Sequence, residues 1–528
     1  MYTRDRLNRR EFIQVAGGGA AALYVWGCSM SARPFADLPA GTMGPVPKDD
    51  WPELAQIALA RIKSGGCGYG DIRLLETHNQ SVRAEDQRIA NVGERFDSGY
   101  GIRALYNGAW GFAASADFTP DEVRRTADRA VEIARASHVL MKEPVRLADE
   151  PVHHDRVKTA FQMDPFTVPL ADKCSLLLGV SEVLHREKGI IRSNGFLWAQ
   201  RDAKHFASTE GTGIDFDLLA VGGSFGATAK KDDDFQSREF SLPFRRTGYE
   251  HVAGADFMSH APRVAAQAVE KVSASQPTPG KYDLVLDGAH LSLTIHESCG
   301  HPTELDRALG YEANFAGTSF LSPDKLGSFR YGSKQVNLIA DNTRAGGMAS
   351  TGYDDDGVAG QRWAIIEEGI LRGYSTNREV AGAIGEKRSR GSCRADSWSS
   401  VPIVRIANVG LEPGTETLDS LLGGVEKGIY IEGRGSFSID QKRYNFQFGG
   451  DAFWEIKNGK RGAMLKNVIY NGITPEFWSS CDGVASRDFW TEHGFINCGK
   501  GQPGQSGWMT HAASPARFRQ VNVIDPKG

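Results

Sequence analysis

The chain has 528 residues, too many for one hydrophobic core, so two or three domains are expected. With 40% hydrophobic and 24% charged residues, the composition is that of a soluble globular protein. The net charge is -4, Lys+Arg and Asp+Glu nearly balance, and there is no basic stripe, so no nucleic-acid partner is expected.

The N-terminus, "NRREFIQVAGGGAAALYVWGC", predicts a twin-arginine-type export signal over residues 1–28. Arg9 and Arg10 are followed by Phe-Ile and by a small-residue apolar run too short to span a bilayer permanently. The alternative interpretation is a basic tail before a short buried helix. The signal predicts an exported protein, located in the periplasm or anchored to the membrane.

The end of this signal resembles a lipobox, in which Cys28 would be lipidated after cleavage. Trp26 is a poor residue at its position in such a motif, so the sequence leaves open whether Cys28 carries a lipid anchor. The other six cysteines are widely spaced and form neither a disulfide framework nor a CxxC zinc ribbon.

The next segments predict a Pro- and Ala-rich linker over 29–50 and an N-terminal α/β domain over 51–275, within an overall α+β fold class. Its first helix is expected over 51–63, ending at Gly65-Gly66. A hairpin is expected at Asn107-Gly108. Thr119 is placed to cap a helix, another helix is expected over 166–187, and successive strands follow.

The stretch "SASQPTPGKYDLVLD" marks the boundary of a second, mostly β domain over 276–528. A strand is expected over 282–287, and a helix from Ala289 onward. Strand runs separated by Gly-rich turns follow beyond residue 320, including one hairpin around Asn458-Gly459.

The helix of the second domain carries "TIHESCGHPTELD", in which His296 and His301 are five residues apart. On a regular α-helix this spacing turns the two rings about 140° away from each other, so they could not share an ion. A π-bulge would realign them, and Gly300 and Pro302 interrupt the helical hydrogen bonding at this point. The motif therefore indicates either a metal site on a distorted helix, with Glu297 beside it, or a polar helix face.

Several separate stretches resemble the TldD/PmbA family of metallopeptidases, and within it the metal-bearing TldD branch. The stretches are "HESCGHPTELD", "FAGTSFLSPDKLG", "TGYDDDGVAGQRWAIIEEGILRGYSTNRE", "CRADSWSSVPIVRIANVGLEPG" and "INCGKGQPGQ", with further matches in the N-terminal strands. The resemblance covers roughly residues 51–510. It departs from the better-known members in its export signal, since those are cytoplasmic.

The resemblance implies that Cys498 is a third ligand, beside His296 and His301, of a zinc ion (Zn2+). Imidazole and thiolate suit zinc, whose catalytic sites keep three protein ligands and a water. Glu297 is implied to be the general base that takes a proton from the zinc-bound water. The implied activity is hydrolysis of peptides or unfolded polypeptide segments, with the substrate held as an added strand.

Other residues near these motifs are further candidates for the site. Cys299, between the histidines, is expected to be a packed thiol rather than a ligand. Glu304 and Asp306 either orient the imidazoles or form a solvated helix end. Structural or surface positions are expected for His493 and His511, and an acidic turn rather than a calcium loop is expected for residues 354–356.

Three rival functions follow from the sequence. The G-x-S-x-G stretch at 222–226 matches a serine-hydrolase elbow but lacks a following helix. A dipeptidyl peptidase III-like enzyme would need a glutamate-rich ligand motif, which "IIEEGILRG" does not resemble. The family also includes subunits without the metal motif, so a catalytically silent partner or binding subunit is the alternative function. The resemblance implies a homodimer, or a heterodimer with a paralogous subunit.

Overall fold

The computed structural model describes residues 48–525, so the predicted signal over 1–28, Cys28 and most of the linker lie outside the described residues. Residues 49 onward form one compact unit, and the domain boundary near 275 stays a prediction. Lys48–Asp50, the end of the predicted linker, is a 3-10 turn that leads into the first helix. Within the described part of the chain, no helix is both long and apolar enough to cross a membrane.

The first half of the described chain is built on a seven-stranded sheet, in the order β3-β2-β1-β5-β6-β4 with β7 beside β6. All neighbouring strands are antiparallel except β4 and β6. Asn107 and Gly108 have φ values of 47° and 86°, which confirms the predicted tight hairpin between β2 and β3. The strands are β1 (Tyr69–Glu85), β2 (Arg88–Tyr106), β3 (Ala109–Ser115), β4 (His154–Lys158), β5 (Ile190–Ser208), β6 (Gly213–Lys231) and β7 (Asp234–Arg245).

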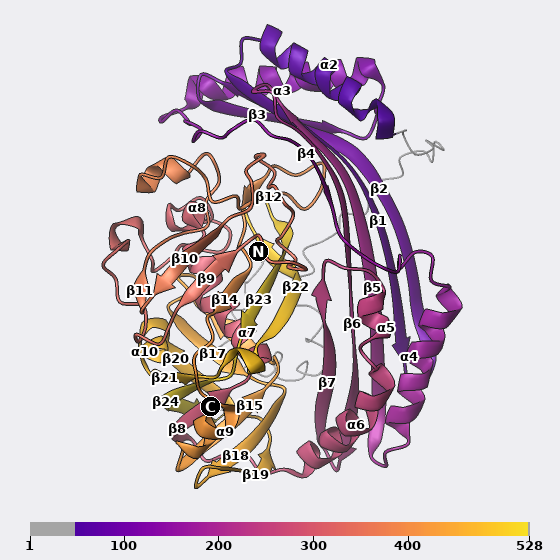
Figure 1. Ribbon diagram of the computed structural model, residues 1–528, viewed down its shortest axis with the longest axis vertical. Helices are drawn as coiled ribbons and strands as arrows, with labels where there is room; N and C mark the ends of the chain where they lie inside the picture. Colours follow the sequence, from indigo (N-terminus) through magenta and orange to yellow (C-terminus); the bar gives the residue numbers. More distant parts are fainter. Residues whose placement is uncertain (1–47, 526–528) are drawn as a thin grey trace, which may run out of the picture. The chain divides into compact units, whose positions relative to one another are not determined.

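Helices cover this sheet in two groups (Figure 1). One group packs on β1, β2 and β3, and the other packs mainly along β5, β6 and β7 and also contacts β1. The Thr119 hydroxyl accepts a hydrogen bond from the Glu122 backbone N–H, which confirms the predicted cap. The helices are α2 (Trp51–Ser64) and α3 (Pro120–Leu140) in the first group, and α4 (Leu170–His185), α5 (Glu250–Ala253) and α6 (Phe257–Ser273) in the second.

The second half contains a nine-stranded sheet in the order β16-β17-β20-β24-β8-β15-β18-β19, with β21 beside β24. The second half also contains a six-stranded sheet in the order β11-β10-β9-β14-β23-β22. A third, two-stranded sheet pairs β12 with β13. The strands of the larger sheet are β8 (Gly280–Leu286), β15 (Lys427–Glu432), β16 (Phe437–Ile439), β17 (Asn445–Gly449), β18 (Ala452–Lys457), β19 (Lys460–Leu465), β20 (Ile469–Ile473), β21 (Cys481–Val484) and β24 (Ala516–Ile524).

The predicted motif helix is α7 (Gly288–Ile295), which follows β8 directly. It contacts β15 of the larger sheet and β14, β22 and β23 of the smaller one, so both sheets bury it (Figure 1). The remaining elements are β9 (Leu338–Asp341), β10 (Arg362–Glu367), β11 (Ile370–Leu371), β12 (Cys393–Arg394), β13 (Ile403–Val404), β14 (Val409–Leu411), β22 (Thr491–Lys500), β23 (Gln505–Ala513), α8 (Leu305–Ala308), α9 (Leu418–Gly423) and α10 (Thr474–Ser479).

These elements confirm the predicted α+β fold with a mostly β C-terminal part. They also exclude the serine-hydrolase interpretation. Ser224 lies inside β6, where it pairs with Phe196 of β5 and Ser241 of β7, so no strand-turn-helix elbow forms around it. The "IIEEGILRG" stretch is a β10-β11 hairpin rather than a ligand-bearing helix.

Candidate metal centre

The motif helix changes its winding where the two histidines lie. Asp287 caps the start of α7 by accepting a hydrogen bond from the His290 N–H at 2.7 Å. His296–Gly300 then form a π-helical turn, in which the His301 N–H bonds to the His296 carbonyl five residues back. A 3-10 turn, His301–Thr303, follows at once. The predicted π-bulge is therefore confirmed, and it brings histidines spaced five apart onto one side of the helix.

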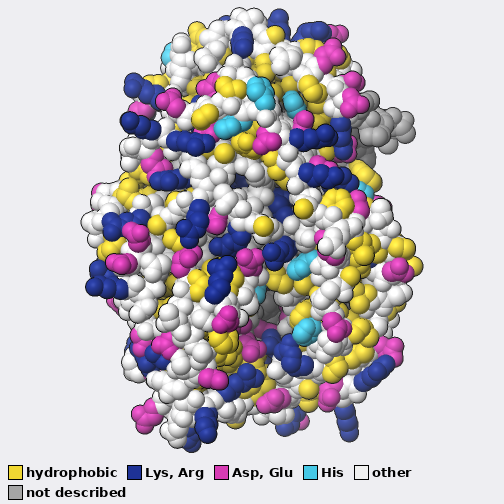
Figure 2. Space-filling view, in the orientation of Figure 1, with side chains coloured by type: hydrophobic (Ala, Val, Ile, Leu, Met, Phe, Trp, Pro, Cys, Tyr) yellow, Lys and Arg dark blue, Asp and Glu magenta, His cyan; other side chains and the backbone are white. Residues whose placement is uncertain are grey.

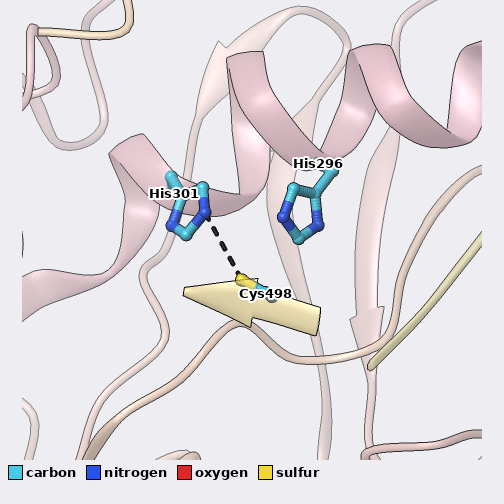
Figure 3. Close-up of side chains that lie close together, drawn as sticks. All are labelled: His296, His301 and Cys498. Carbon is cyan, nitrogen blue, oxygen red and sulfur yellow. Dashed lines mark hydrogen bonds between the residues drawn. The ribbon is translucent and has the colours of Figure 1, made fainter. Parts of the chain in front are cut away.

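His296, His301 and Cys498 converge (Figure 3). One potential ligand atom from each lies within 4.8 Å of the others, and all three side chains are buried. The Cys498 Sγ is 3.4 Å from the His301 Nε2. Cys498 comes from β22, and the β22-β23 pairing shifts register between Phe495 and Cys498. That irregularity lets Phe495 and Cys498 both approach the motif helix.

Each imidazole is oriented through its other nitrogen. The His301 Nδ1 is 2.8 Å from the Glu304 carboxylate, so this nitrogen is the donor and Nε2 keeps a lone pair on the cysteine side. The His296 Nδ1 is 2.9 Å from the His511 Nε2, while the His511 Nδ1 is 3.2 Å from the Val409 carbonyl. Because a carbonyl only accepts, His511 donates from Nδ1 and accepts from His296. His296 Nε2 therefore also keeps its lone pair.

Both imidazoles are held neutral. Burial lowers the pKa of His296 well below its usual range, and the neighbouring His301 and His511 lower it further. Burial, followed by the Arg443 charge, does the same for the pKa of His301. Neutral imidazole is the form that binds metals. The prediction that His511 is merely structural is incomplete, because it lies directly behind His296.

Glu297 lies beside the cluster but is not part of it. Its carboxylate forms a hydrogen-bonded ion pair with the guanidinium of Arg443, which comes from the turn between β16 and β17. Burial raises the pKa of Glu297, and the Arg443 charge opposes that rise. A carboxylate balanced in this way is suited to accept and release a proton. Arg443 lies 146 residues from Glu297, and no motif in the sequence marked it.

Glu304 and Asp306 belong to a buried ionic network. The Lys500 Nζ is 2.6 Å from one Asp306 oxygen and 3.3 Å from Glu304 Oε1. All three residues are buried, so the interpretation as a solvated helix end is wrong. Glu304 orients an imidazole, as the alternative predicted. Asp306 instead holds Lys500, which in turn lies against Glu304.

Burial and a neighbouring cation act in opposite directions on the pKa of the Cys498 thiol. Burial raises the pKa of its thiol to about 12, although the Arg405 guanidinium opposes this. Arg405 also donates a hydrogen bond to the Cys498 carbonyl. A coordinated divalent cation would deprotonate the thiol outright. Two neutral imidazoles and one thiol, each with a free donor atom turned to a common point, fit a zinc-like ion.

The other candidate residues lie outside the cluster. Cys299 is fully buried in the hydrophobic core, as predicted for a packed thiol. His493 contacts the Thr491 hydroxyl at 3.0 Å. The acidic turn at 354–356 is buried rather than solvated, since Asp355 pairs with Lys204 and Asp356 with Arg103. Both carboxylates are therefore ion-paired with cations of the N-terminal sheet.

Comparisons with known proteins agree with this geometry. The model of the PmbA/TldA metallopeptidase C-terminal domain matches residues 279–519, and that of PmbA/TldA metallopeptidase domain 1 matches residues 70–134. A metalloprotease of Methanocaldococcus jannaschii is 28% identical over 434 residues, which cover 82% of this chain and 92% of that protein. A zinc metalloprotease TldD homolog of Saccharolobus solfataricus is 24% identical over 467 residues, or 87% of this chain and 97% of that protein.

The fold is also similar to that of a solved structure, TldE from Thermococcus kodakarensis. The TM-score is 0.65 with 16% sequence identity, and the match covers 89% of this chain and 100% of that chain. At this identity the likeness concerns the fold alone.

Proposed function

Because the chain belongs to the PmbA/TldA metallopeptidase family, we propose that it is a zinc-dependent peptidase whose metal is held by His296, His301 and Cys498. The observation that carries this proposal is the convergence of their three donor atoms within 4.8 Å. The names of the relatives, a metalloprotease and a zinc metalloprotease homolog, support the same chemistry.

Within this proposal each residue has a defined task. A bound zinc ion supplies Lewis-acid chemistry, polarising a peptide carbonyl and lowering the pKa of water. Glu297 accepts the proton of the attacking water and delivers it to the leaving amine. Arg443 orients the Glu297 carboxylate through their ion pair and favours its ionised form against the effect of burial. Glu304 and His511 fix the two imidazoles in the tautomers that leave Nε2 free.

We propose peptides or unfolded polypeptide segments as substrates. In the six-stranded sheet, β22 is one of the two edge strands; it carries Cys498 and also contacts β7 of the N-terminal sheet. An extended peptide that pairs with such an edge is recognised mainly by its backbone. The alternative, a catalytically silent partner subunit, is disfavoured because the donor cluster and Glu297 are both intact.

The test of the proposed function is the Glu297→Gln variant, which removes the proton acceptor and leaves the three ligands in place. It should retain about one zinc per chain. Its hydrolysis of unfolded peptides should fall about 10²–10⁴-fold below that of the wild type, the usual contribution of a positioned acid–base group. Equal cleavage by both proteins would place the chemistry elsewhere.

Metal analysis of two cysteine variants checks the ligand set. Cys498→Ala should lose zinc, whereas Cys299→Ala should keep it, since Cys299 lies in the core away from the donor atoms. The opposite result would show that the ligand assignment is wrong.

We further propose export by the twin-arginine route and association as a homodimer or with a paralogous subunit. Arg9 and Arg10 support the first, and the fold shared with TldE the second. Replacing both arginines by lysine should retain the precursor in the cytoplasm, and unchanged export would contradict the signal. Light scattering measures the molar mass of the purified protein, alone and with a paralogous subunit, and so distinguishes a homodimer from a heterodimer.

A further inference from the structure

The turn after β15 is hydrogen-bonded to the N-terminal end of the motif helix α7. The Gly433 N–H donates to the Asp287 carboxylate at 3.1 Å, and the Gly433 carbonyl lies 2.9 Å from the His290 Nδ1. Gly433 has a φ of 73°, a left-handed conformation that glycine adopts without strain. These contacts fix the backbone from which the next side chain, Arg434, extends.

The Arg434 side chain reaches the candidate metal centre through one aromatic ring. Its guanidinium carbon lies 4.7 Å from the centre of the Phe495 ring. The same ring stacks on His296, with a centroid distance of 4.8 Å and an interplanar angle of 9°. Phe495 thus connects the guanidinium to a proposed zinc ligand and holds it at a set distance from the site.

Most N–H donors of the Arg434 guanidinium have no hydrogen-bond partner in the part of the chain that the structure describes. Among the described residues its only hydrogen bond is a long one, 3.5 Å, to the Ser241 hydroxyl, and it forms no ion pair with any of them. By contrast, Arg443 pairs with Glu297, and the buried Arg238 pairs with both Glu432 and Asp451. A guanidinium offers five N–H donors in a planar fork that matches a carboxylate.

The charge of Arg434 is also incompletely balanced. Burial lowers its pKa, and only Glu239, from β7, and Asp287 oppose this from beyond ion-pair distance. Asp287 is a weak counterion, because burial raises its own pKa to about 7. Figure 2 shows a central hollow on one face of the molecule, with Lys and Arg side chains gathered around it. An anionic ligand beside Arg434 would supply the missing charge.

We propose that Arg434 binds a carboxylate of the peptide substrate, two or three residues from the bond that is cleaved. The inference rests on the proposed peptidase function, and it adds a preference to backbone recognition. The ring distances of 4.8 Å from His296 to Phe495 and 4.7 Å from Phe495 to the Arg434 guanidinium bound the span, so two or three residues of extended chain, at about 3.3 Å each, are enough to cover it. The carboxylate belongs to an acidic side chain or to the C-terminus of the substrate.

The experiment uses the full-length, zinc-loaded protein and three forms of one short peptide that otherwise lacks Asp and Glu. The first form has a free C-terminal carboxylate, the second a C-terminal amide, and the third the amide plus a single Glu moved stepwise along the sequence. The variants are Arg434→Gln, Arg434→Lys and the control Arg461→Gln. Arg461 also lies over an aromatic ring, that of Trp454 at 3.7 Å, but on the β18-β19 hairpin.

Wild type should cleave at least one carboxylate form faster than the amide form. Arg434→Gln should lower kcat/KM for that form about 10- to 100-fold, the worth of a charge-assisted bidentate contact, and should change the amide form less than about twofold. Arg434→Lys should lie between, since it keeps the charge and loses the fork. Preference for the free C-terminus identifies a terminal carboxylate, and preference for one Glu position identifies a side chain.

Two results would overturn the inference: no preference for either carboxylate in the wild type, or an equal loss on all peptides in Arg434→Gln. If no form is cleaved by any protein, the proposed function fails separately. In that case the inference is tested by binding: fluorescence anisotropy measures the affinity of the labelled peptides for the zinc-loaded wild type and for Arg434→Gln. Binding that needs both the carboxylate and Arg434 supports the inference, and equal binding overturns it.

Discussion

Glu304 shows how one buried carboxylate shapes the candidate metal centre without belonging to the donor cluster. One of its oxygens accepts the His301 Nδ1–H, and the other faces the Lys500 ammonium at 3.3 Å. The first contact selects the imidazole tautomer, and the second places a cation against the buried carboxylate. Removing only the charge separates these two roles.

We expect Glu304→Gln to weaken zinc binding about 10- to 100-fold, the usual effect of losing a partner that orients a metal-binding histidine. The glutamine amide cannot satisfy both His301 and Lys500 as the carboxylate does. Competition with a chromophoric chelator measures the affinity. Glu386→Gln is the control, because Glu386 pairs with Arg390 away from the site. Zinc affinity equal to that of the wild type would show that Glu304 has no such role.

At the scale of the element, the π-helical turn depends on a close approach between two segments. A Cβ added at Gly300 would lie 2.9 Å from Cγ2 and 3.0 Å from Cδ1 of Ile406. Gly300 itself has φ -56° and ψ -65°, which any residue can adopt. The glycine is therefore required for space, not for backbone freedom.

Gly300→Ala should consequently destabilise the fold by about 1–3 kcal/mol, the range for overpacking a dense core. In an Ile406→Ala background the same change should cost less, because the clashing methyl groups are gone. Urea unfolding of the four proteins in this double-mutant cycle measures the coupling. If the losses in free energy of unfolding from the two single substitutions simply add in the double variant, residues 300 and 406 are not in the close contact described above.

At the scale of the whole molecule, buried ion pairs join the N-terminal sheet to the acidic turn at 354–356. Arg103 bonds to Asp71 within the sheet and to Asp356 in the turn, at 2.7 and 2.8 Å. Lys204 lies 2.6 Å from Asp355. Removing one partner of such a pair leaves the other buried and uncompensated. The acidic turn thus contributes to stability through distant strands.

Asp355 makes this contribution dependent on pH. Burial raises its pKa, but Lys204 and Arg73 outweigh burial and lower the pKa from 3.8 to about 2. Since the folded state has the lower pKa, the stabilisation is present above about pH 4 and is lost as pH falls toward 2. It amounts to about 2 kcal/mol at neutral pH and about half of that near pH 3.

We therefore expect the metal-free wild type to exceed Asp355→Asn in free energy of unfolding at pH 6, with a difference that shrinks by pH 3. Urea titrations at several pH values measure it. Asp128→Asn serves as the control, because Asp128 and its partner Arg61 are both exposed. A difference between wild type and Asp355→Asn that stays constant down to pH 3 would contradict the lowered pKa.

Local chemistry was enough to predict much of this fold. The Asn107-Gly108 hairpin, the Thr119 cap and the distorted helix around Gly300 and Pro302 all appear where the sequence placed them. Turn geometry, capping and helix breaking depend on neighbours within a few residues, so a short window contains the relevant physics. The same window contains His296, Glu297 and His301, and so most of the candidate site.

The remaining partners were decided by the tertiary structure alone. Cys498 was expected only through family resemblance, and the same stretch contains Lys500 but gave it no role. Nothing in the sequence marked Arg443 or placed His511 against His296. These residues lie between 146 and 215 positions from the groups they contact in the motif segment. Strand register and loop packing place these residues beside the motif segment, and both depend on how all the strands of a sheet pair with one another. A short window of sequence cannot predict these contacts, because each one depends on the register of strands that lie far away in the chain.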